Sequence, residues 1–233
     1  HGGEWTEWQI PPRVEALKAQ ARAEGLWNLF LPDAELGAGL SVLDYAFSAE
    51  QTGRSMMAPE IFNCNAPDSG NMEVIWKYGN AEQKERFLQA LARGDMLGAF
   101  CLTEPHVGSE AGGLKTTAAR DGDHYVLNGV KQFITSGKNG DVAIVMAVTD
   151  KAAGKKGISA FIVPTATPGY TVARTEDKMG QHASDTAQIL FENCRVPVEN
   201  LLVEEGLGLK IALSGLEGGR IGIAAQSVGM ARS

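Results

Sequence analysis

The first 94 residues carry apolar side chains at the three- and four-residue spacing of amphipathic helices. Val14, Leu17 and Ala21 share one such face. A third predicted helix carries Met72, Ile75 and Trp76 in the same way. Each helix is expected to stop at a glycine, which readily adopts the left-handed backbone of a helix end. The four stops are Gly25, Gly53, Gly79 and Gly94.

Polar residues at the predicted helix starts support this pattern. Two pairs have the three-residue spacing of a side-chain cap, Ser41 with Asp44 and Asn80 with Gln83. Asp68 or Ser69 is the expected cap of the third helix. We therefore predict four helices before residue 95.

After Gly94 the apolar period changes to two, which is typical of strands. Seven are expected, at residues 97–103, 114–120, 124–136, 142–149, 158–164, 170–175 and 186–196. Asn128-Gly129 divides the third segment and predicts a hairpin, because both residues tolerate positive φ. Short strands without helices between them predict an antiparallel β-barrel or sandwich.

Helical spacing returns after about residue 206 and continues to the end of the chain. The predicted class is thus α+β, with an all-α domain at 1–96, a β-barrel or sandwich domain at 97–205, and a final helix at 206–233 that is either cut off or stands alone. Glycine follows the same division, since 9 of the 28 glycines lie in residues 1–96 and 19 in residues 97–233.

Composition narrows the class of protein. Hydrophobic residues make up 44% of the 233 positions and charged residues 21%, which excludes a disordered or collagen-like chain. The net charge of −7 argues against nucleic-acid binding. The longest apolar stretch, residues 141–149, is far shorter than the roughly 20 residues of a membrane span. Three cysteines without metal-site spacing favour a reducing compartment.

Common catalytic motifs are absent from the sequence. Gly206 and Gly208 begin a dinucleotide-binding pattern, but Ile211 stands where its third glycine belongs. The four histidines are scattered, so no metal site is expected. Two segments remain as candidates: 100–110, with Gly108-Ser109 near a loop tip, and 133–137. A glycine beside a serine can approach a phosphate or carbonyl closely, but from these residues alone a plain surface turn is the preferred interpretation.

Taken in order, these segments resemble the acyl-CoA dehydrogenase family. The resemblance rests on CLTEPHVGSE, DGDHYVLNGVKQFITSG, GISAFIVP, KMGQHASDT, FENCRVPVENLL and GLKIALSGLEGGRIGIAAQSVGMA. It implies a helical N-terminal domain, a β-barrel-like middle domain and a C-terminal four-helix bundle, of which this chain holds the first two and one further helix.

The resemblance also implies FAD as cofactor and acyl-CoA as substrate. The flavin would be lined by Phe100, Leu102 and Thr103 on one side, with Thr103 hydrogen-bonded to the isoalloxazine edge. Gly108 and Ser109 would complete that loop, Ser109 meeting the FAD pyrophosphate and the acyl-CoA. The residues implied for the other side of the ring are Phe133, Ile134 and Thr135.

Glu217 and Arg220 fit the family's pantetheine-contacting stretch, while a solvated pair on a helix explains them about as well from the residues alone. Lys151, Lys155 and Lys156 could meet the CoA phosphates, although a mobile basic loop is the preferred interpretation. Four positions depart from the family pattern: His106, Val107, Glu110 and Phe133, the last replacing a common Trp.

The implied reaction is the α,β-dehydrogenation of an acyl-CoA thioester to the 2-enoyl-CoA, with a carboxylate as base. Some members place this base directly before the helix arginine, where this chain has Gly219. Glu217 would point elsewhere on the helix, and Glu104 belongs to the loop framework. We therefore expect no catalytic base in this chain, a base beyond Ser233, and little activity from the chain alone.

Alternatives of other classes stay open. The chain could be a non-catalytic flavin- or acyl-CoA-binding or assembly protein, or an oxygen-reactive relative such as an acyl-CoA oxidase or flavin monooxygenase. For the dehydrogenase, the resemblance implies an electron-transfer flavoprotein as acceptor and a homotetramer. The expected compartment is the bacterial cytoplasm or the mitochondrial matrix.

Overall fold

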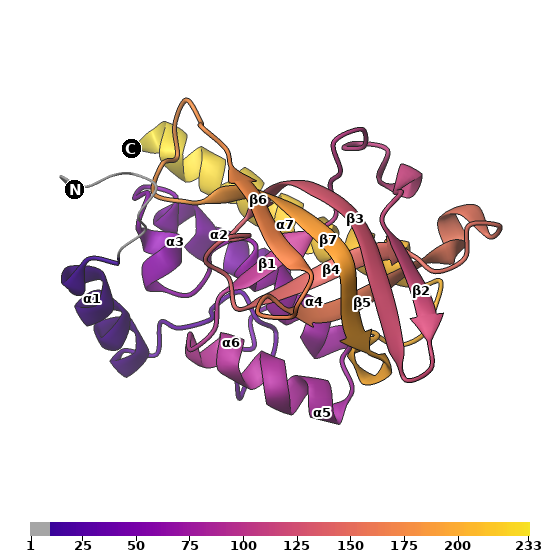
Figure 1. Cartoon of the computed structure of the whole chain (residues 1–233). Helices are drawn as coiled ribbons and strands as arrows, with labels where there is room; N and C mark the ends of the chain where they lie inside the picture. The colour runs from indigo at the N-terminus through magenta and orange to yellow at the C-terminus, as the bar shows by residue number, and fades with distance from the viewer. Residues whose placement is uncertain (1–9) are drawn as a thin grey trace.

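A computed structural model describes residues 10–233 of the chain (Figure 1). The part of the predicted 1–96 domain before residue 10, including Trp5 and Trp8, lies outside the described residues. From residue 10 to Arg93 the regular elements are all helices. They are α1 (Pro12–Ala23), α2 (Val42–Thr52), α3 (Ala58–Ile61), α4 (Asp68–Tyr78), α5 (Ala81–Gln83) and α6 (Gln89–Arg93), the last two joined by a π-helical turn over Lys84–Leu88.

The predicted helix ends are largely confirmed. The Ser41 side chain accepts the Asp44 amide at the start of α2, and Asn80 and Gln83 form the capping box before α5. Gly94 ends α6 in the left-handed conformation, with φ of 72°. The predicted cap of α4 is wrong, because the helix begins at Asp68 itself. The Asp68 carboxylate instead accepts the Gly98 amide at 2.5 Å, so it joins this helix to the first strand.

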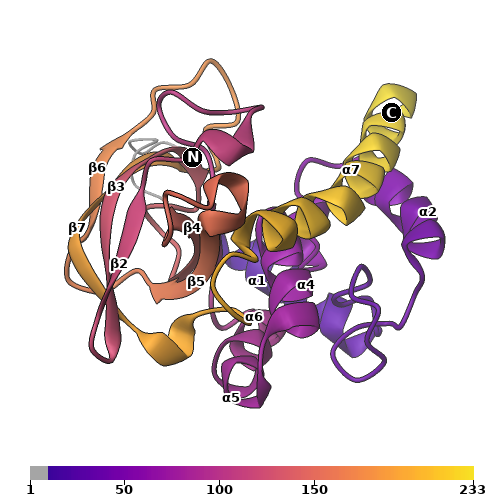
Figure 2. The same ribbon diagram turned by 90° about the vertical axis from the view of Figure 1, so that its right-hand side faces the viewer.

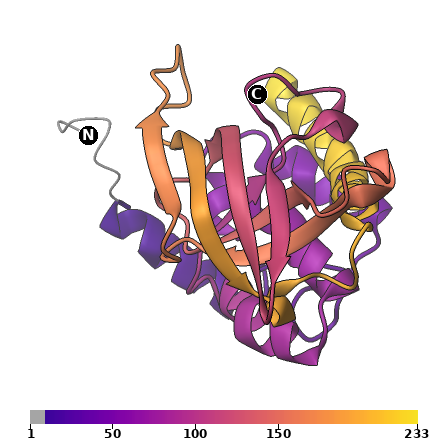
Figure 3. The same ribbon diagram turned by 45° about the vertical axis from the view of Figure 1, so that its right-hand side comes forward.

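Seven strands follow, and a final helix. The strands are β1 (Gly98–Cys101), β2 (Thr117–Asp121), β3 (His124–Thr135), β4 (Val142–Val148), β5 (Ile158–Pro164), β6 (Tyr170–Thr175) and β7 (Thr186–Pro197). They form one curled sheet in the order β1-β4-β2-β3-β7-β6, with β5 paired to β4. Figure 3 shows β2, β3, β7 and β6 side by side.

The sheet is mixed and not wholly antiparallel as predicted. β1 runs parallel to β4 over four residue pairs, and β2 meets the end of β4 in parallel at Thr117 and Val148. The other pairings are antiparallel. A period-two pattern reports which side chains are buried but carries no information on strand direction. The α+β class is confirmed, and the direction of two pairings is corrected.

The predicted hairpin at Asn128-Gly129 is wrong. β3 continues through both residues, with Gly129 paired to Phe191 of β7. The tight turn lies earlier, where Asp121 pairs with His124 across Gly122-Asp123. Gly129 is required for another reason, since a Cβ there would lie 2.4 Å from the Thr116 hydroxyl oxygen.

Two hydrophobic cores share the central strands. Val142, Ile144 and Met146 of β4 face the helices, whereas Ala143 and Val145 face the inside of the curled sheet. Both faces of β4 are therefore buried, which explains its continuous apolar sequence. The core between helices and sheet holds the two parts of the chain together.

The last helix, α7 (Gly208–Arg232), leaves the sheet and runs to α2 (Figure 2). It crosses α4 where Gly215 lies against Val74. Farther along, Gly229 approaches the backbone of Glu50 so closely that any side chain at this glycine would collide with it. The α7 glycines thus allow close packing against two N-terminal helices.

Candidate functional site

The two segments singled out in the sequence meet in the structure. The Gln132 amide of β3 donates a 2.9 Å hydrogen bond to the Thr103 carbonyl, just beyond the end of β1. Thr103 and Thr135 are both half-buried, as is Phe100 within β1. Segments 100–104 and 131–135 therefore form one continuous structural unit.

A buried ion pair joins these segments. Lys131 Nζ lies 2.9 Å from Glu104 Oε1, and the side chains are 0% and 2% exposed. The same ammonium donates to the Leu102 carbonyl at 3.2 Å. The Glu104 carboxylate also accepts the amides of Lys115 and Thr116, at 2.8 and 3.0 Å.

Burial alone would raise the pKa of Glu104, but the charge of Lys131 and the hydrogen bonds from Thr116 and Lys115 bring it below its ordinary value. Burial lowers the pKa of Lys131, and the Glu104 carboxylate opposes that change. The pair is therefore a fully hydrogen-bonded, ionised link between β3 and the loop after β1.

Phe133 is the exposed aromatic residue of the unit. Its side chain is 63% exposed, and its φ of 59° lies in the left-handed region that a bulky residue rarely adopts. The β3–β7 register shifts by one residue between Lys131 and Ile134, so Phe133 belongs to a β-bulge. This bulge turns the ring outward, away from the core.

Two of the predicted cofactor residues have buried side chains. Leu102 belongs to the core between helices and sheet, and Ile134 to the core inside the sheet. Any contact from either residue to a cofactor would therefore come from its backbone.

The predicted loop tip is open to solvent. Gly108 and Ser109 are exposed, and a Cβ built at Gly108 meets nothing within 4 Å. The next residue, Glu110, forms an ion pair of 2.8 Å with Lys155, whose aliphatic chain lies over Gly112. Lys155 is thus engaged by the chain's own carboxylate.

A second polar network holds the bulge through the side chain of Gln132. Gln132 is buried, donates to Glu176 and accepts from Gln188 at 2.5 Å. Arg174 contacts the same Glu176 carboxylate at 3.2 Å. A side chain just after β6 and one from β7 therefore hold the residue that precedes Phe133.

Two of the three predicted substrate residues lie on a different element. Glu217 and Arg220 are exposed on α7, and within residues 10–233 neither forms an ion pair. Gly219 is also exposed, with nothing within 4 Å of a Cβ built there. The Glu73 carboxylate of α4 lies 3.3 Å from a Cβ built on Gly218, and burial raises its pKa to about 7. No hydrogen bond described here joins Glu217 or Arg220 to the 100–104 and 131–135 unit.

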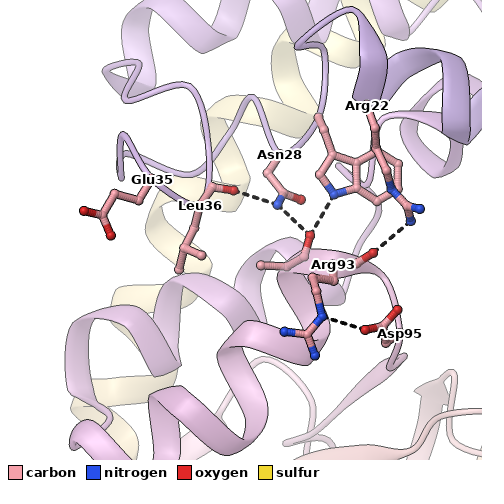
Figure 4. Close-up of a pocket in the computed structure, with 8 residues that line it drawn as sticks. Arg22, Asn28, Glu35, Leu36, Arg93 and Asp95 are labelled. Atoms are coloured by element: carbon pink, nitrogen blue, oxygen red, sulfur yellow. Dashed lines mark hydrogen bonds and ion pairs between the residues drawn. The ribbon is translucent and has the colours of Figure 1, made fainter.

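A cavity of about 400 Å³ lies elsewhere, between the N-terminal helices (Figure 4). Its polar groups are largely bonded to one another: Trp27 and Asn28 both donate to the Ala92 carbonyl, and Arg22 donates to that of Arg93. None of the predicted site residues lines it. We therefore assign it no part in the site.

Two kinds of feature are absent from residues 10–233. No group of three or more histidine, cysteine or acidic side chains is placed to hold a metal ion. No described helix combines the length and apolar character needed to cross a bilayer.

Lys131 was missed as a site residue in the sequence. Tyr125, Leu127 and Lys131 are all buried, so simple alternation along the strand places the lysine on the inward side. A lysine at a strand position where alternation predicts a buried side chain is the signal that could have identified Lys131. Its partner Glu104 is 27 residues away, which no local pattern reveals.

Comparison with known proteins gives consistent results. "Acyl-CoA dehydrogenase, N-terminal domain" matches residues 1–95, and "Acyl-CoA dehydrogenase, middle domain" matches residues 99–194. The mouse mitochondrial short-chain specific acyl-CoA dehydrogenase is 43% identical over 209 residues, which cover 90% of this chain and 50% of the relative. The chain thus spans about half the length of this curated relative.

Two solved structures show the same fold. Butyryl-CoA dehydrogenase from Megasphaera elsdenii is 36% identical with a TM-score of 0.76, over 97% of this chain and 67% of that one. Glutaryl-CoA dehydrogenase from Mycobacterium smegmatis, solved in complex with FADH2, is 34% identical with a TM-score of 0.79, over 94% and 54%.

Proposed function

The chain belongs to the acyl-CoA dehydrogenase family, and from this premise we propose that it forms the flavin- and thioester-binding part of an enzyme that oxidises acyl-CoA to 2-enoyl-CoA. The observation that carries the proposal is the junction of segments 100–104 and 131–135 by the Gln132–Thr103 hydrogen bond and the Lys131–Glu104 pair. Thr103 lies on one of the joined segments, and Phe133 and Thr135 lie on the other.

The residues of this junction fit FAD. A flat heteroaromatic ring needs an apolar face and hydrogen-bond partners at its edge. Phe133 offers the face, and the half-buried hydroxyls of Thr103 and Thr135 offer the partners. Open backbone at Gly108 and the exposed Ser109 hydroxyl suit a phosphate group. When bound, FAD supplies the two-electron acceptor for the hydride that leaves the substrate β carbon.

The proposed substrate contacts lie at Ser109, Glu217 and Arg220. Hydrogen bonds to the thioester carbonyl would stabilise the charge that develops when the α proton leaves. No residue of this chain is assigned as the base that takes this proton. Gly219 carries no side chain, and Glu217 lies about 200° from it around the helix axis.

The partners follow from the same proposal. An electron-transfer flavoprotein is the proposed acceptor, and a homotetramer the proposed assembly. A dehydrogenase is preferred to an oxidase or monooxygenase because the named relatives described above are acyl-CoA dehydrogenases.

The test is a flavin titration followed by an assay. The purified protein is expected to bind FAD, seen as a change in flavin fluorescence on titration. With FAD and butyryl-CoA, the 233-residue protein is expected to form little crotonyl-CoA, because it lacks an assigned base. Absence of FAD binding would contradict the proposed cofactor role, whereas rapid oxidation would contradict the assignment of no base. Hydrogen peroxide formation would favour the oxidase.

A further inference from the structure

Lys131 is a charged side chain with no exposed surface, and it is not among the residues proposed to contact cofactor or substrate. Its ammonium contacts the Leu102 carbonyl at 3.2 Å and the Glu104 carboxylate at 2.9 Å. These two acceptors belong to the residues on either side of Thr103. One side chain from β3 thus holds the backbone before Thr103 and the side chain after it.

The backbone of β3 also contacts the segment around Thr103. Gln132, the next residue of β3, donates its amide to the Thr103 carbonyl at 2.9 Å. Glu104 is fixed in turn by a reciprocal pair of 3.0 Å backbone bonds with Val107, which close the turn leading to the loop tip. The position of Thr103 is therefore set by contacts from β3 and not only by the end of β1 that precedes it.

The bulge that exposes Phe133 begins directly after Lys131. Phe133 has strained backbone and an exposed ring, so it needs support from its neighbours to keep one conformation. Lys131 anchors one end of this bulge to the Glu104 turn, while Gln132 is held by Glu176 and Gln188. The same ion pair thus fixes both faces of the candidate flavin site relative to each other.

From these contacts we propose that Lys131 is a positioning residue for the flavin: it sets the separation of Thr103 and Phe133 through Leu102 and Glu104. The inference rests on the proposed function, because it concerns the same cofactor. Lys131 itself touches no cofactor in this scheme. Its part is to hold a donor and an aromatic face at a fixed spacing before the flavin arrives, which lowers the ordering cost of binding.

The experiment compares FAD affinity and visible circular dichroism of the bound flavin in four proteins. These are the unaltered chain, Lys131→Met, the double variant Glu104→Gln with Lys131→Met, and the matched control Lys155→Met. The double variant leaves no buried charge unpaired, so it is expected to regain folding stability. Its methionine side chain still cannot donate to the Leu102 carbonyl, so the double variant is not expected to regain flavin binding.

We expect the double variant to bind FAD about tenfold more weakly and with an altered flavin circular dichroism, since one positioning hydrogen bond is worth about that factor. The Lys155→Met control should change affinity less than about twofold. Unchanged affinity and spectrum in a folded double variant would overturn the inference alone. If the unaltered chain binds no FAD, the proposed function fails and this inference fails with it.

Discussion

Two ion pairs hold the loop between β1 and β2, one at Glu104 near its start and the other at Glu110 near its middle, and they differ most in their burial. The Lys131–Glu104 and Lys155–Glu110 pairs have nearly equal separations of 2.9 and 2.8 Å. The first pair is 0% and 2% exposed, and the second is 67% and 72% exposed. Because the two N–O distances are nearly equal, a difference in how much the two pairs stabilise the fold reflects their burial and not their distance.

The difference shows which contact fixes the loop. Near the surface, water screens the attraction, and two long side chains lose freedom to maintain it. In the interior, each charge has lost its hydration, so it depends on its partner and on the surrounding hydrogen bonds. The Glu104 end should therefore be rigid and intolerant of substitution, whereas the Glu110 end should tolerate it.

The largest expected effect comes from Lys131→Met. This change leaves the Glu104 carboxylate buried without its counter-charge, which costs about 3–5 kcal/mol of the free energy of unfolding. Urea denaturation followed by far-UV circular dichroism measures this loss. The matched Lys155→Met variant should unfold at the same urea concentration as the unaltered protein. Equal destabilisation by the two variants would break the comparison.

A second, smaller effect is expected at one of two glycines that lie beside these pairs. A Cβ at Gly129 would lie 2.6 Å from the backbone of Thr116, whose amide donates to Glu104. Gly129→Ala should therefore cost about 1–3 kcal/mol, because backbone must shift. At Gly112 the obstacle is the flexible chain of Lys155, 2.7 Å away, which can move aside.

Gly112→Ala is the control for that experiment, and its urea midpoint should stay close to that of the unaltered protein. Both midpoints come from the same denaturation series. A Gly112→Ala variant as unstable as Gly129→Ala would show that the Glu110 end is as tightly packed as the Glu104 end.

Much of the fold could be predicted because its signals are local. The Ser41–Asp44 cap, the Asn80–Gln83 box and the stop at Gly94 each depend on residues within one helical turn. The failures depend on distant residues. Asn128 bonds to Asn193, 65 positions away, inside a continuous strand pair, so the Asn-Gly sequence does not turn the chain.

The candidate site shows the same limit. The resemblance named Thr103, Ser109 and Phe133 from short motifs, and their roles stay predictions. What sequence reasoning missed is the contact that joins the motifs, since Lys131 and Glu104 belong to different motifs. The inward phase of Lys131 was visible in the sequence, but its partner could be identified only once the strands were placed in the sheet.

The smallest expected effect is a pH dependence that distinguishes the two carboxylates. The folded protein lowers the pKa of Glu104 below the ordinary value of about 4.3, so the unfolded chain takes up its proton first as the pH falls. Its stabilising contribution is therefore complete above about pH 4.3 and is lost as the pH drops through the lowered folded value.

Glu104→Gln lacks this contribution at every pH. Urea midpoints of Glu104→Gln and the unaltered protein should thus differ most near neutrality and converge as the pH falls below about 4.3, whereas Glu110→Gln should match the unaltered protein throughout. A Glu104→Gln difference that stays constant over this whole range would show that the Glu104 charge adds no stability.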